Sequence, residues 1–218
     1  MKKRSIIAFI LLILLTTITS KQKIIISKFN IKEIKIENNL LLQSEDIIKS
    51  LKPIYDKNLI NLNYRLIEEE LLKNTFVESF NIKKKYPNTL IIKIVEKKPI
   101  AILQNKKKKY FLSEKIDLIE FSNAKKYKEL PFVFGEKKKF KIFYNDLKEI
   151  NFPFKIIKKY TLYDSNRWDI ETINQKVIKL PSNNYVKSLQ NYLDLKTKKN
   201  FENYKVFDYR IENQLILK

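Results

Sequence analysis

The sequence contains no histidine and no cysteine, and its single glycine is Gly135. The absence of histidine excludes a Ser-His-Asp triad and most zinc sites, and one glycine is too few for a P-loop or a dinucleotide-binding fingerprint. The absence of cysteine excludes disulfides and thiol chemistry. A Ser–Lys dyad is an alternative, but lysine is so frequent that pairs such as Ser113 with Lys115, or Ser27 with Lys28, arise by chance. We therefore expect no enzyme, with no catalytic residues, no cofactor and no metal site.

Arginine is also scarce, although the net charge is +21. Only positions 4, 65, 167 and 210 are arginines, and lysine supplies the rest of the positive charge. Nucleic-acid surfaces usually draw on arginine for bidentate contacts to phosphate and guanine, so we expect no nucleic-acid partner. The lysines are spread through every segment, which is typical of a solvated coat; attraction to an anionic surface is the alternative. Asparagine is abundant and is expected to replace glycine in turns.

The chain has one long apolar run, Ser5–Ser20, and basic residues flank it on both sides. As a helix of about 16 residues it would span about 24 Å, which is shorter than a hydrocarbon core of about 30 Å. The flanking lysines can extend their side chains to the interface and make up part of this difference. We predict a transmembrane helix over residues 5–21, preceded by a cytoplasmic tail at residues 1–4.

A cleaved signal peptide is the alternative interpretation of this run, because a basic start and a short apolar core describe one as well. No A-x-A cleavage site follows, and cleavage after Ser20 would place Ile18 at the −3 position. The uncleaved anchor is therefore favoured. In either case the rest of the chain is expected outside the cytoplasm, since long domains are translocated largely regardless of flanking charge.

Residues 24–98 are predicted to form a first folded unit with the order β-α-α-β-β. The expected strands are Ile24–Ile36, Phe76–Lys84 and Thr89–Glu96, and the expected helices are one that starts at Ser44 and one at Asn63–Lys73. Ser44 is the expected N-cap of the first helix, and Pro53 is expected to end it. In the last strand the alternating residues Leu90, Ile92 and Ile94 are expected to face inward.

Residues 99–218 are predicted to form a second, mainly antiparallel β domain with two helices, which makes the whole protein α+β. The expected strands are Tyr110–Leu112, Ile116–Ile119, Ile156–Tyr163, Trp168–Thr172 and Lys176–Leu180, and the expected helices are Phe140–Ile150 and a segment capped by Asn183 or Asn184 that reaches about Lys196.

The terminal stretch Val206–Lys218 alternates between apolar and polar residues, which is typical of a strand with one buried face. Phe207, Tyr209, Ile211, Leu215 and Leu217 share the apolar parity. A turn near Glu212-Asn213 would divide the stretch into a hairpin, so one strand and a hairpin both remain open.

Several passages, which together extend over nearly all of the chain, resemble the FtsQ/DivIB family of bacterial cell-division proteins. They are Phe29–Ile36, Ser44–Ile47, Tyr86–Leu90 and Val95–Ala101 in the first unit, and Leu130–Gly135, Arg167–Ile170, Val177–Pro181 and Phe207–Arg210 in the second. The family's glycines after the first strand and near Asp117 are replaced here by other residues.

The resemblance implies a POTRA domain at residues 24–98 and an FtsQ-type β domain at residues 99–218. It also implies a non-enzymatic, single-pass protein of the inner membrane at the division septum, with a cytoplasmic N-terminus and a periplasmic C-terminal domain. The implied partners are FtsB and FtsL, and through them the FtsW and FtsI peptidoglycan synthases, with no small-molecule substrate.

In the family a partner adds a strand to the sheet edge near the C-terminus, so that backbone hydrogen bonds supply affinity and alternating side chains supply selectivity. The matching positions in this chain are Ile211, Asn213, Gln214, Leu215, Ile216 and Leu217, together with Arg210 directly before them. Arg167, on a neighbouring element, is implied as a charged contact for a partner carboxylate.

A POTRA module of outer-membrane protein assembly or secretion is the alternative function. That class predicts several tandem POTRA repeats or an attached barrel, and this sequence contains the pattern of one such domain.

Overall fold

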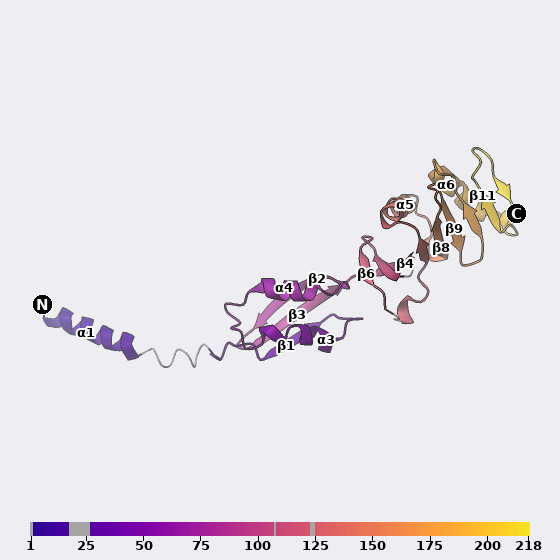
Figure 1. Ribbon diagram of the computed structural model, residues 1–218. Helices are drawn as coiled ribbons and strands as arrows, with labels where there is room; N and C mark the ends of the chain where they lie inside the picture. The colour runs from indigo at the N-terminus through magenta and orange to yellow at the C-terminus, as the bar shows by residue number, and fades with distance from the viewer. Residues whose placement is uncertain (1, 18–26, 107, 123–124) are drawn as a thin grey trace. The chain divides into compact units, whose positions relative to one another are not determined.

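The computed structural model describes residues 2–17, 27–106, 108–122 and 125–218. The chain divides into two compact units, Met1–Lys97 and Lys98–Lys218 (Figure 1). The first unit contains a three-stranded sheet and the second a nine-stranded sheet, and each unit has its own hydrophobic core. The protein is therefore of the mixed α+β class, as predicted.

The first helix, α1 (Lys2–Thr17), covers most of the apolar run, and its Ile, Leu and Phe side chains are exposed. Among the residues that the structure describes, no helix combines the length and the apolar character needed to cross a membrane. Residues 18–21 of the predicted transmembrane segment and residues 24–26 of the first predicted strand lie outside the described residues.

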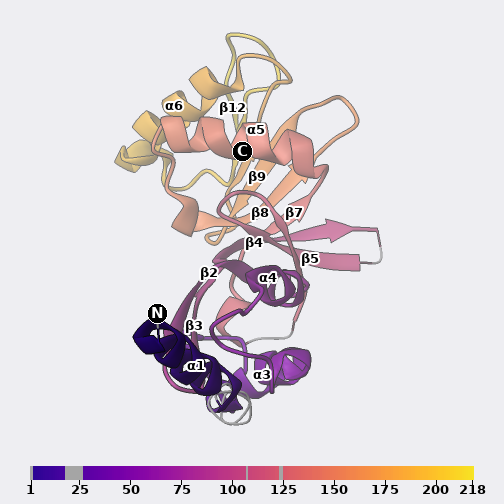
Figure 2. The same ribbon diagram turned by 90° about the vertical axis from the view of Figure 1, so that its left-hand side faces the viewer.

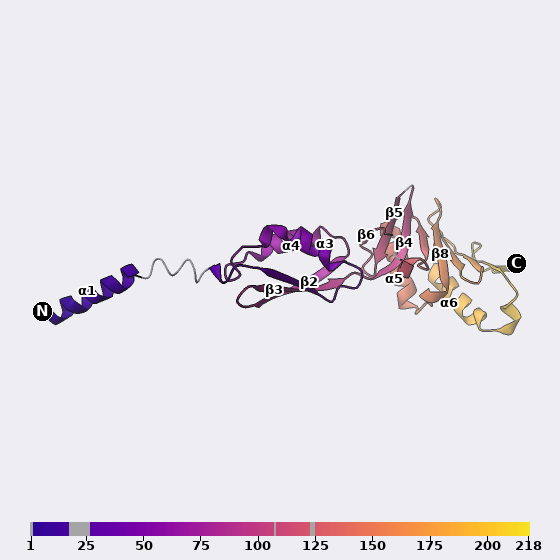
Figure 3. The same cartoon turned by 90° about the horizontal axis from the view of Figure 1, so that it is seen from below.

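The first unit has the predicted order β-α-α-β-β. Its elements are β1 (Glu33–Glu37), α3 (Ser44–Ser50), a 3-10 turn at Lys52–Ile54, α4 (Tyr64–Leu72), β2 (Val77–Lys85) and β3 (Thr89–Glu96). The central strand β3 pairs with β1 in parallel and with β2 in antiparallel orientation. Both helices cover one face of this sheet (Figure 3). Leu90, Ile92 and Ile94 are at most 1% exposed, which confirms the inward face predicted from their alternation.

Two local predictions for the first unit are wrong. Residues 29–32 are not part of the strand, because their backbone bonds to the loop at residues 57–59 and to Asn88 instead. Ser44 is the first residue of α3, so the N-cap position is Gln43. The Ser44 hydroxyl accepts a hydrogen bond of 3.1 Å from the Asn39 side chain. As predicted, α3 ends before Pro53, which lies in the following 3-10 turn, where its missing amide is tolerated.

The second unit is built on one mixed sheet with the order β12-β11-β10-β9-β8-β7-β4-β5-β6. Its strands are β4 (Pro99–Asn105), β5 (Lys108–Ser113), β6 (Leu118–Glu120), β7 (Phe132–Phe134), β8 (Ile157–Leu162), β9 (Trp168–Thr172), β10 (Val177–Lys179), β11 (Val206–Asp208) and β12 (Ile216–Leu217). The pairs β4–β7, β7–β8 and β10–β11 are parallel and the other five are antiparallel.

Two helices of the second unit, α5 (Lys137–Glu149) and α6 (Tyr185–Lys196), contribute to one core with the sheet (Figure 2). Short 3-10 turns lie at Lys125–Tyr127, Phe154–Ile156 and Lys199–Phe201. The Phe143 ring of α5 stacks on Trp168 of β9, with 4.9 Å between their centroids. The first residue of α6 follows Asn184, whose φ is 56° and whose side chain makes no capping hydrogen bond, so the predicted asparagine cap is not formed.

Gly135 follows β7 at a point where the sheet has no space for a side chain. A Cβ atom at this position would lie 2.7 Å from Cβ of Leu162 on β8 and 3.0 Å from Cη2 of Trp168. The Leu162 Cβ is fixed by its own backbone and cannot move away. The single glycine of the chain is therefore required by close packing.

Asparagine occupies the turn positions that glycine would otherwise take. Asn38, Asn151, Asn166, Asn184 and Asn213 have φ between 53° and 66°, in the left-handed region. Asparagine tolerates this region better than most residues. The substitution of asparagine for glycine in turns is therefore confirmed at these five positions.

The C-terminal stretch is a hairpin and not one strand. β11 and β12 are antiparallel, with Phe207 opposite Leu217 and Asp208 opposite Ile216. Residues 209–215 connect them, and Asn213 has a φ of 57°. Ile211 therefore leaves the buried parity on which it was predicted and is 51% exposed.

Candidate partner-binding edge

Among the described residues, β12 lies at one margin of the nine-stranded sheet, and its only neighbouring strand is β11. Val206 and Lys218 exchange backbone hydrogen bonds of 2.9 and 3.1 Å. In an antiparallel pair the residues alternate between bonded and non-bonded positions, so the amide and carbonyl of Leu217 point away from β11. The margin thus offers backbone groups to an additional strand.

The hairpin brings together the C-terminal residues predicted to bind a partner, but it gives them different roles. Only Ile216 and Leu217 are in the edge strand, whereas Ile211, Asn213 and Gln214 are in the exposed connection. The side chains of Leu215 and Leu217 pack against the core. Ile216 has the opposite parity and is 39% exposed on the outer face of the sheet. Of the positions that the resemblance implies for strand addition, Ile211, Asn213 and Gln214 therefore lie outside the edge strand.

A row of charged side chains crosses the outer face of the sheet beside this edge. The strand register aligns Asp169 of β9 with Lys179 of β10, Lys179 with Asp208 of β11, and Asp208 with Ile216 of β12. Asp169 and Asp208 are 7% and 5% exposed, so both carboxylates are nearly buried. The row leads directly to the open strand.

Arg167 and Arg210 each bond to one carboxylate of the row. Arg167 donates from Nη1 to Oδ1 of Asp169 at 3.0 Å, and its guanidinium lies 4.0 Å from the centre of the Tyr163 ring. Arg210 donates from Nε and Nη2 to the two oxygens of Asp208 at 2.8 and 2.7 Å. Arg210 is 47% exposed and Arg167 is 18% exposed. Arg210 is therefore the more accessible of the two cations.

The two carboxyl groups have pKa values shifted in opposite directions. The hydrogen bond from Arg210 lowers the pKa of Asp208 below its ordinary value. Burial raises the pKa of Asp169, although Arg167, Lys179 and Arg210 act against that rise. With three cations and two carboxylates, the cluster has a net positive charge when all five groups are ionised. An incoming carboxylate would meet a favourable field.

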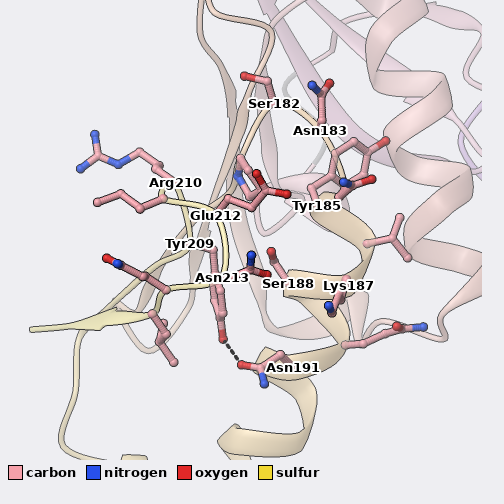
Figure 4. A pocket seen from close by; sticks show the side chains of 17 residues that line it. Ser182, Asn183, Tyr185, Lys187, Ser188, Asn191, Tyr209, Arg210, Glu212 and Asn213 are labelled. Atoms are coloured by element: carbon pink, nitrogen blue, oxygen red, sulfur yellow. Dashed lines mark hydrogen bonds between the residues drawn. The ribbon is translucent and has the colours of Figure 1, made fainter.

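A polar cavity of about 1100 Å³ lies between the hairpin connection and the start of α6 (Figure 4). Its walls are residues 181–188, 190 and 191 at the start of α6, and residues 209–215 of the connection. The Tyr209 hydroxyl donates a 2.9 Å hydrogen bond to Oδ1 of Asn191, which joins the two walls. Figure 4 shows Arg210 directed away from the cavity. The hairpin connection therefore lines this cavity, while the Arg210 side chain is directed to the other side, where it bonds to Asp208.

Sequence reasoning missed Asp169, Lys179 and Asp208, as well as the helix side of the cavity. One signal was present: Arg167 and Asp169, like Asp208 and Arg210, are two positions apart, which puts both members of a pair on one face of extended chain. The alignment of Lys179 between the two carboxylates depends on strand order and could not be read locally.

Comparison with known families matches both units of the chain. The family described as "POTRA domain, FtsQ-type" matches residues 29–97, and "Cell division protein FtsQ/DivIB, C-terminal" matches residues 101–210. The second match ends at Arg210, so the connection after it and β12 lie beyond the matched region.

Curated relatives have the same two names. "Cell division protein DivIB" of Clostridium tetani is 29% identical over 111 residues, which are 51% of this chain and 42% of that protein. "Cell division protein FtsQ" of Rickettsia bellii is 27% identical over 193 residues, covering 85% of this chain and 71% of that protein. The chain thus spans less than half the length of the Clostridium relative.

Among solved structures, the major extracytoplasmic domain of DivIB from Geobacillus stearothermophilus aligns with a TM-score of 0.34 and 11% identity, covering 50% of this chain and 98% of that one. The resemblance noted in the sequence is confirmed by the two family matches, which include most of both units. This chain belongs to the FtsQ/DivIB family of bacterial cell-division proteins.

Proposed function

We propose that this protein is a non-enzymatic scaffold of the division septum that binds FtsB- and FtsL-like partners and links them to septal peptidoglycan synthesis. The observation that supports it most directly is the position of β12 at the margin of the sheet, with the Leu217 backbone directed outward. Family membership gives cell division as the setting, since the matched relatives are named cell-division proteins.

The partner segment would bind as an added strand along β12. Strand addition uses backbone hydrogen bonds for affinity, so the open groups of Leu217 supply the first of them. β12 itself is only two residues long. A partner strand would therefore extend past it along the hairpin connection, where Asn213 and Gln214 are exposed.

Side chains of the partner strand would alternate between the two faces of the sheet. On the outer face they would meet Ile216 and the accessible guanidinium of Arg210, which suits a residue pair of one apolar and one acidic side chain. On the other face they would point toward the cavity beside α6, whose lining is rich in Asn and Ser. The expected partner segment is therefore acidic on one parity and polar or aromatic on the other.

The apolar run would anchor the protein in the inner membrane, with residues 1–4 in the cytoplasm, the span at residues 5–21, and the POTRA domain (24–98) and β domain (99–218) in the periplasm. Ile, Leu and Phe residues dominate this run. Each contributes about −0.3 to −0.6 kcal/mol to insertion at a helix centre, which favours the membrane.

The test is co-purification of the full chain with an FtsB-like membrane coiled coil. In the test variant, proline replaces Leu217 of β12, whose amide points away from β11. Leu217→Pro removes the amide that a partner strand would use, and it removes no intrachain ladder bond. Leu118→Pro on β6 is the matched control. The Ser113 amide donates to the Asp117 carbonyl at 3.0 Å, so Ser113 and Asp117 are a hydrogen-bonded pair. Bonded and non-bonded positions alternate in an antiparallel pair, so the amide of the next residue, Leu118, points away from β5.

The proposal requires that Leu217→Pro abolishes co-purification while Leu118→Pro retains it, with both variants folded by circular dichroism. Equal binding by the two variants would show that the partner does not use the β12 margin. Binding lost in both, with folding intact, would place the interface elsewhere on the β domain.

A further inference from the structure

One end of the first unit collects three segments that are far apart in the sequence. β1 and β3 are parallel with Glu33 opposite Thr89, so the start of β1 and the β2–β3 turn lie at the same end of the sheet. The Lys32 amide donates to the Asn88 carbonyl at 2.9 Å. The loop after the 3-10 turn is bonded to the segment before β1. The Ile31 amide donates to the Lys57 carbonyl at 3.0 Å, and the Leu59 amide donates to the Phe29 carbonyl at 2.7 Å. We call residues 27–32, 55–64 and 84–88 the proximal end.

The proximal end is rich in exposed lysine. Lys28, Lys32, Lys57 and Lys85 are exposed, and Lys84 is partly buried beside them. The carboxylates at this end are Asp56 and Glu33, and Glu33 already accepts a 3.0 Å hydrogen bond from Thr89 and pairs with Lys35 at 3.3 Å. Cations therefore outnumber carboxylates at the proximal end.

The opposite end of the same unit has the reverse character. The carboxylates there are Glu37 at the end of β1, Glu45 and Asp46 at the start of α3, Glu78 at the start of β2, and Glu96 at the end of β3. Lys73 after α4, Lys93 on β3 and Lys97 after β3 also lie at this end, so the five carboxylates named outnumber these three lysines. Lys93 pairs with Glu37 at 3.3 Å. The unit is thus electrically polarised along its strands, and a lysine coat of uniform density would not produce that.

Exposed apolar and aromatic side chains accompany the proximal lysines. Ile60, Tyr64 and Tyr86 are 50%, 46% and 56% exposed. Nζ of Lys84 lies 5.1 Å from the centre of the Tyr64 ring and donates to the Ile60 carbonyl at 2.9 Å. Tyrosine and lysine in this mixture are typical of a membrane–water interface, where the ring sits among headgroups and the ammonium meets phosphate.

We infer that the proximal end of the POTRA domain binds the anionic phospholipid headgroups of the membrane that holds the anchor. The inference rests on the anchor in the proposed function. If the span ends at residue 21, five residues separate it from Ser27, and extended chain of that length reaches at most about 18 Å. The proximal end is then held beside the headgroups, and the polarity of the unit turns its lysines toward them.

The strength of this contact can be stated as an expected fold-change. A lysine near an anionic lipid surface contributes about fivefold to partition, and the attraction decays within a Debye length of about 10 Å at 0.1 M salt. Removing three proximal lysines should therefore weaken the docked state about a hundredfold or more. The same removal at the opposite end should change it little.

The experiment uses the full chain in nanodiscs of phosphatidylcholine with or without phosphatidylglycerol. Because the chain has no cysteine, one introduced cysteine can be labelled selectively with a fluorophore. Asn61→Cys reports on the proximal end and Gln43→Cys on the opposite end; both positions are exposed. Quenching by lipids with a spin label on the headgroup measures how close each fluorophore comes to the surface.

We expect strong quenching at position 61 in phosphatidylglycerol nanodiscs, less in phosphatidylcholine, and a loss at about 1 M salt, where the Debye length is about 3 Å. The variant K32Q/K57Q/K85Q should lose the quenching, whereas K73Q/K93Q/K97Q, which removes the same charge at the opposite end, should keep it. Position 43 should respond to neither lipid.

Equal quenching at position 61 in both lipids, or equal effects of the two triple variants, would overturn the headgroup site while leaving the anchor intact. Quenching that soluble polyphosphate removes, with no dependence on phosphatidylglycerol, would assign the lysines to a free polyanion and also overturn it. A chain that fails to remain with the nanodiscs would refute the anchor, and the headgroup site with it.

Discussion

The amide of Leu41 donates to both carboxylate oxygens of Glu96, at 3.0 Å each. The amides of Leu40 and Leu42 also donate to Oε1 of Glu96, both at 2.9 Å. One carboxylate at the end of β3 therefore holds three consecutive amides of the loop between β1 and α3. These amides would otherwise depend on solvent, and charged acceptors make the stronger hydrogen bonds.

Replacing Glu96 by glutamine should destabilise the first unit by about 1–3 kcal/mol, because the amide keeps one acceptor oxygen and presents an NH2 group to donors. Urea unfolding of the full chain, followed by circular dichroism, would measure the change. Glu68→Gln on the exposed face of α4 is the control and should stay within about 0.5 kcal/mol of the parent. Equal stability of the two variants would mean that the Glu96 contacts contribute nothing.

Gly135→Ala should destabilise the second unit by about 1–3 kcal/mol, since the new methyl overlaps the Leu162 Cβ at 2.7 Å. Relief would require β7 and β8 to move apart at that point. Thermal unfolding should show a lower midpoint for Gly135→Ala and a still lower one for Gly135→Val. Unchanged midpoints would contradict the close packing described for this residue.

Asp208→Asn should reduce stability at neutral pH by about 1–2 kcal/mol through loss of the ionic hydrogen bonds to Arg210. Because the pKa of Asp208 is lowered in the folded state, its contribution is present above the unfolded pKa of about 3.9. That contribution is lost as the pH falls through the lower, folded pKa. The parent and the variant should therefore converge in stability under acid conditions.

Asp169 provides the contrast, since burial raises its pKa and the sign of its pH dependence is reversed. Its ionised form is disfavoured by folding, so this group adds stability as the pH falls through its folded pKa toward the unfolded value.

The exposed Asp164→Asn is the control for Asp208→Asn and should show the pH profile of the parent. A pH-independent difference between parent and Asp208→Asn would rule out the linkage.

Arg210→Ala should weaken partner binding about tenfold and make it less sensitive to salt, because the accessible guanidinium is the expected contact for a partner carboxylate. Arg167→Ala should lower thermal stability more, since Arg167 is 18% exposed and covers Asp169 and the Tyr163 ring. Isothermal titration with the partner, paired with thermal unfolding, separates the two effects. If Arg210→Ala binds as the parent does at low salt, the carboxylate contact is wrong.

The local sequence pattern was sufficient to predict the buried face of a strand or helix where the periodicity of that segment alone determines it. The alternation of Leu90, Ile92 and Ile94 predicted the buried face of β3, because side chains of a strand alternate with a period of two. The segment Phe140–Ile150 was likewise expected to be a helix, and the structure has it within α5, where Phe140, Phe143 and Leu147 are fully buried. The signals are local because the backbone alone sets these periods.

Prediction failed where a side chain has a competing partner from another part of the chain. Ser44 was expected to cap α3, but its hydroxyl accepts from Asn39. Residues 29–32 have the composition of a strand, yet the loop at residues 57–59 and Asn88 take their backbone bonds. Neither partner can be identified from the spacing of residues within the segment.

The sequence by itself determined the class of the protein, the order of elements in the first unit, the asparagine turns and the family passages, because each depends on residues close together in the chain. The resemblance implied a sheet edge near the C-terminus. Only the tertiary structure decided that this stretch turns back as a hairpin, which limits the edge strand to Ile216 and Leu217, and that Asp169, Lys179 and Asp208 form one row. Strand neighbours are chosen by the packing of the whole sheet, and a local pattern contains no record of which strand lies beside it.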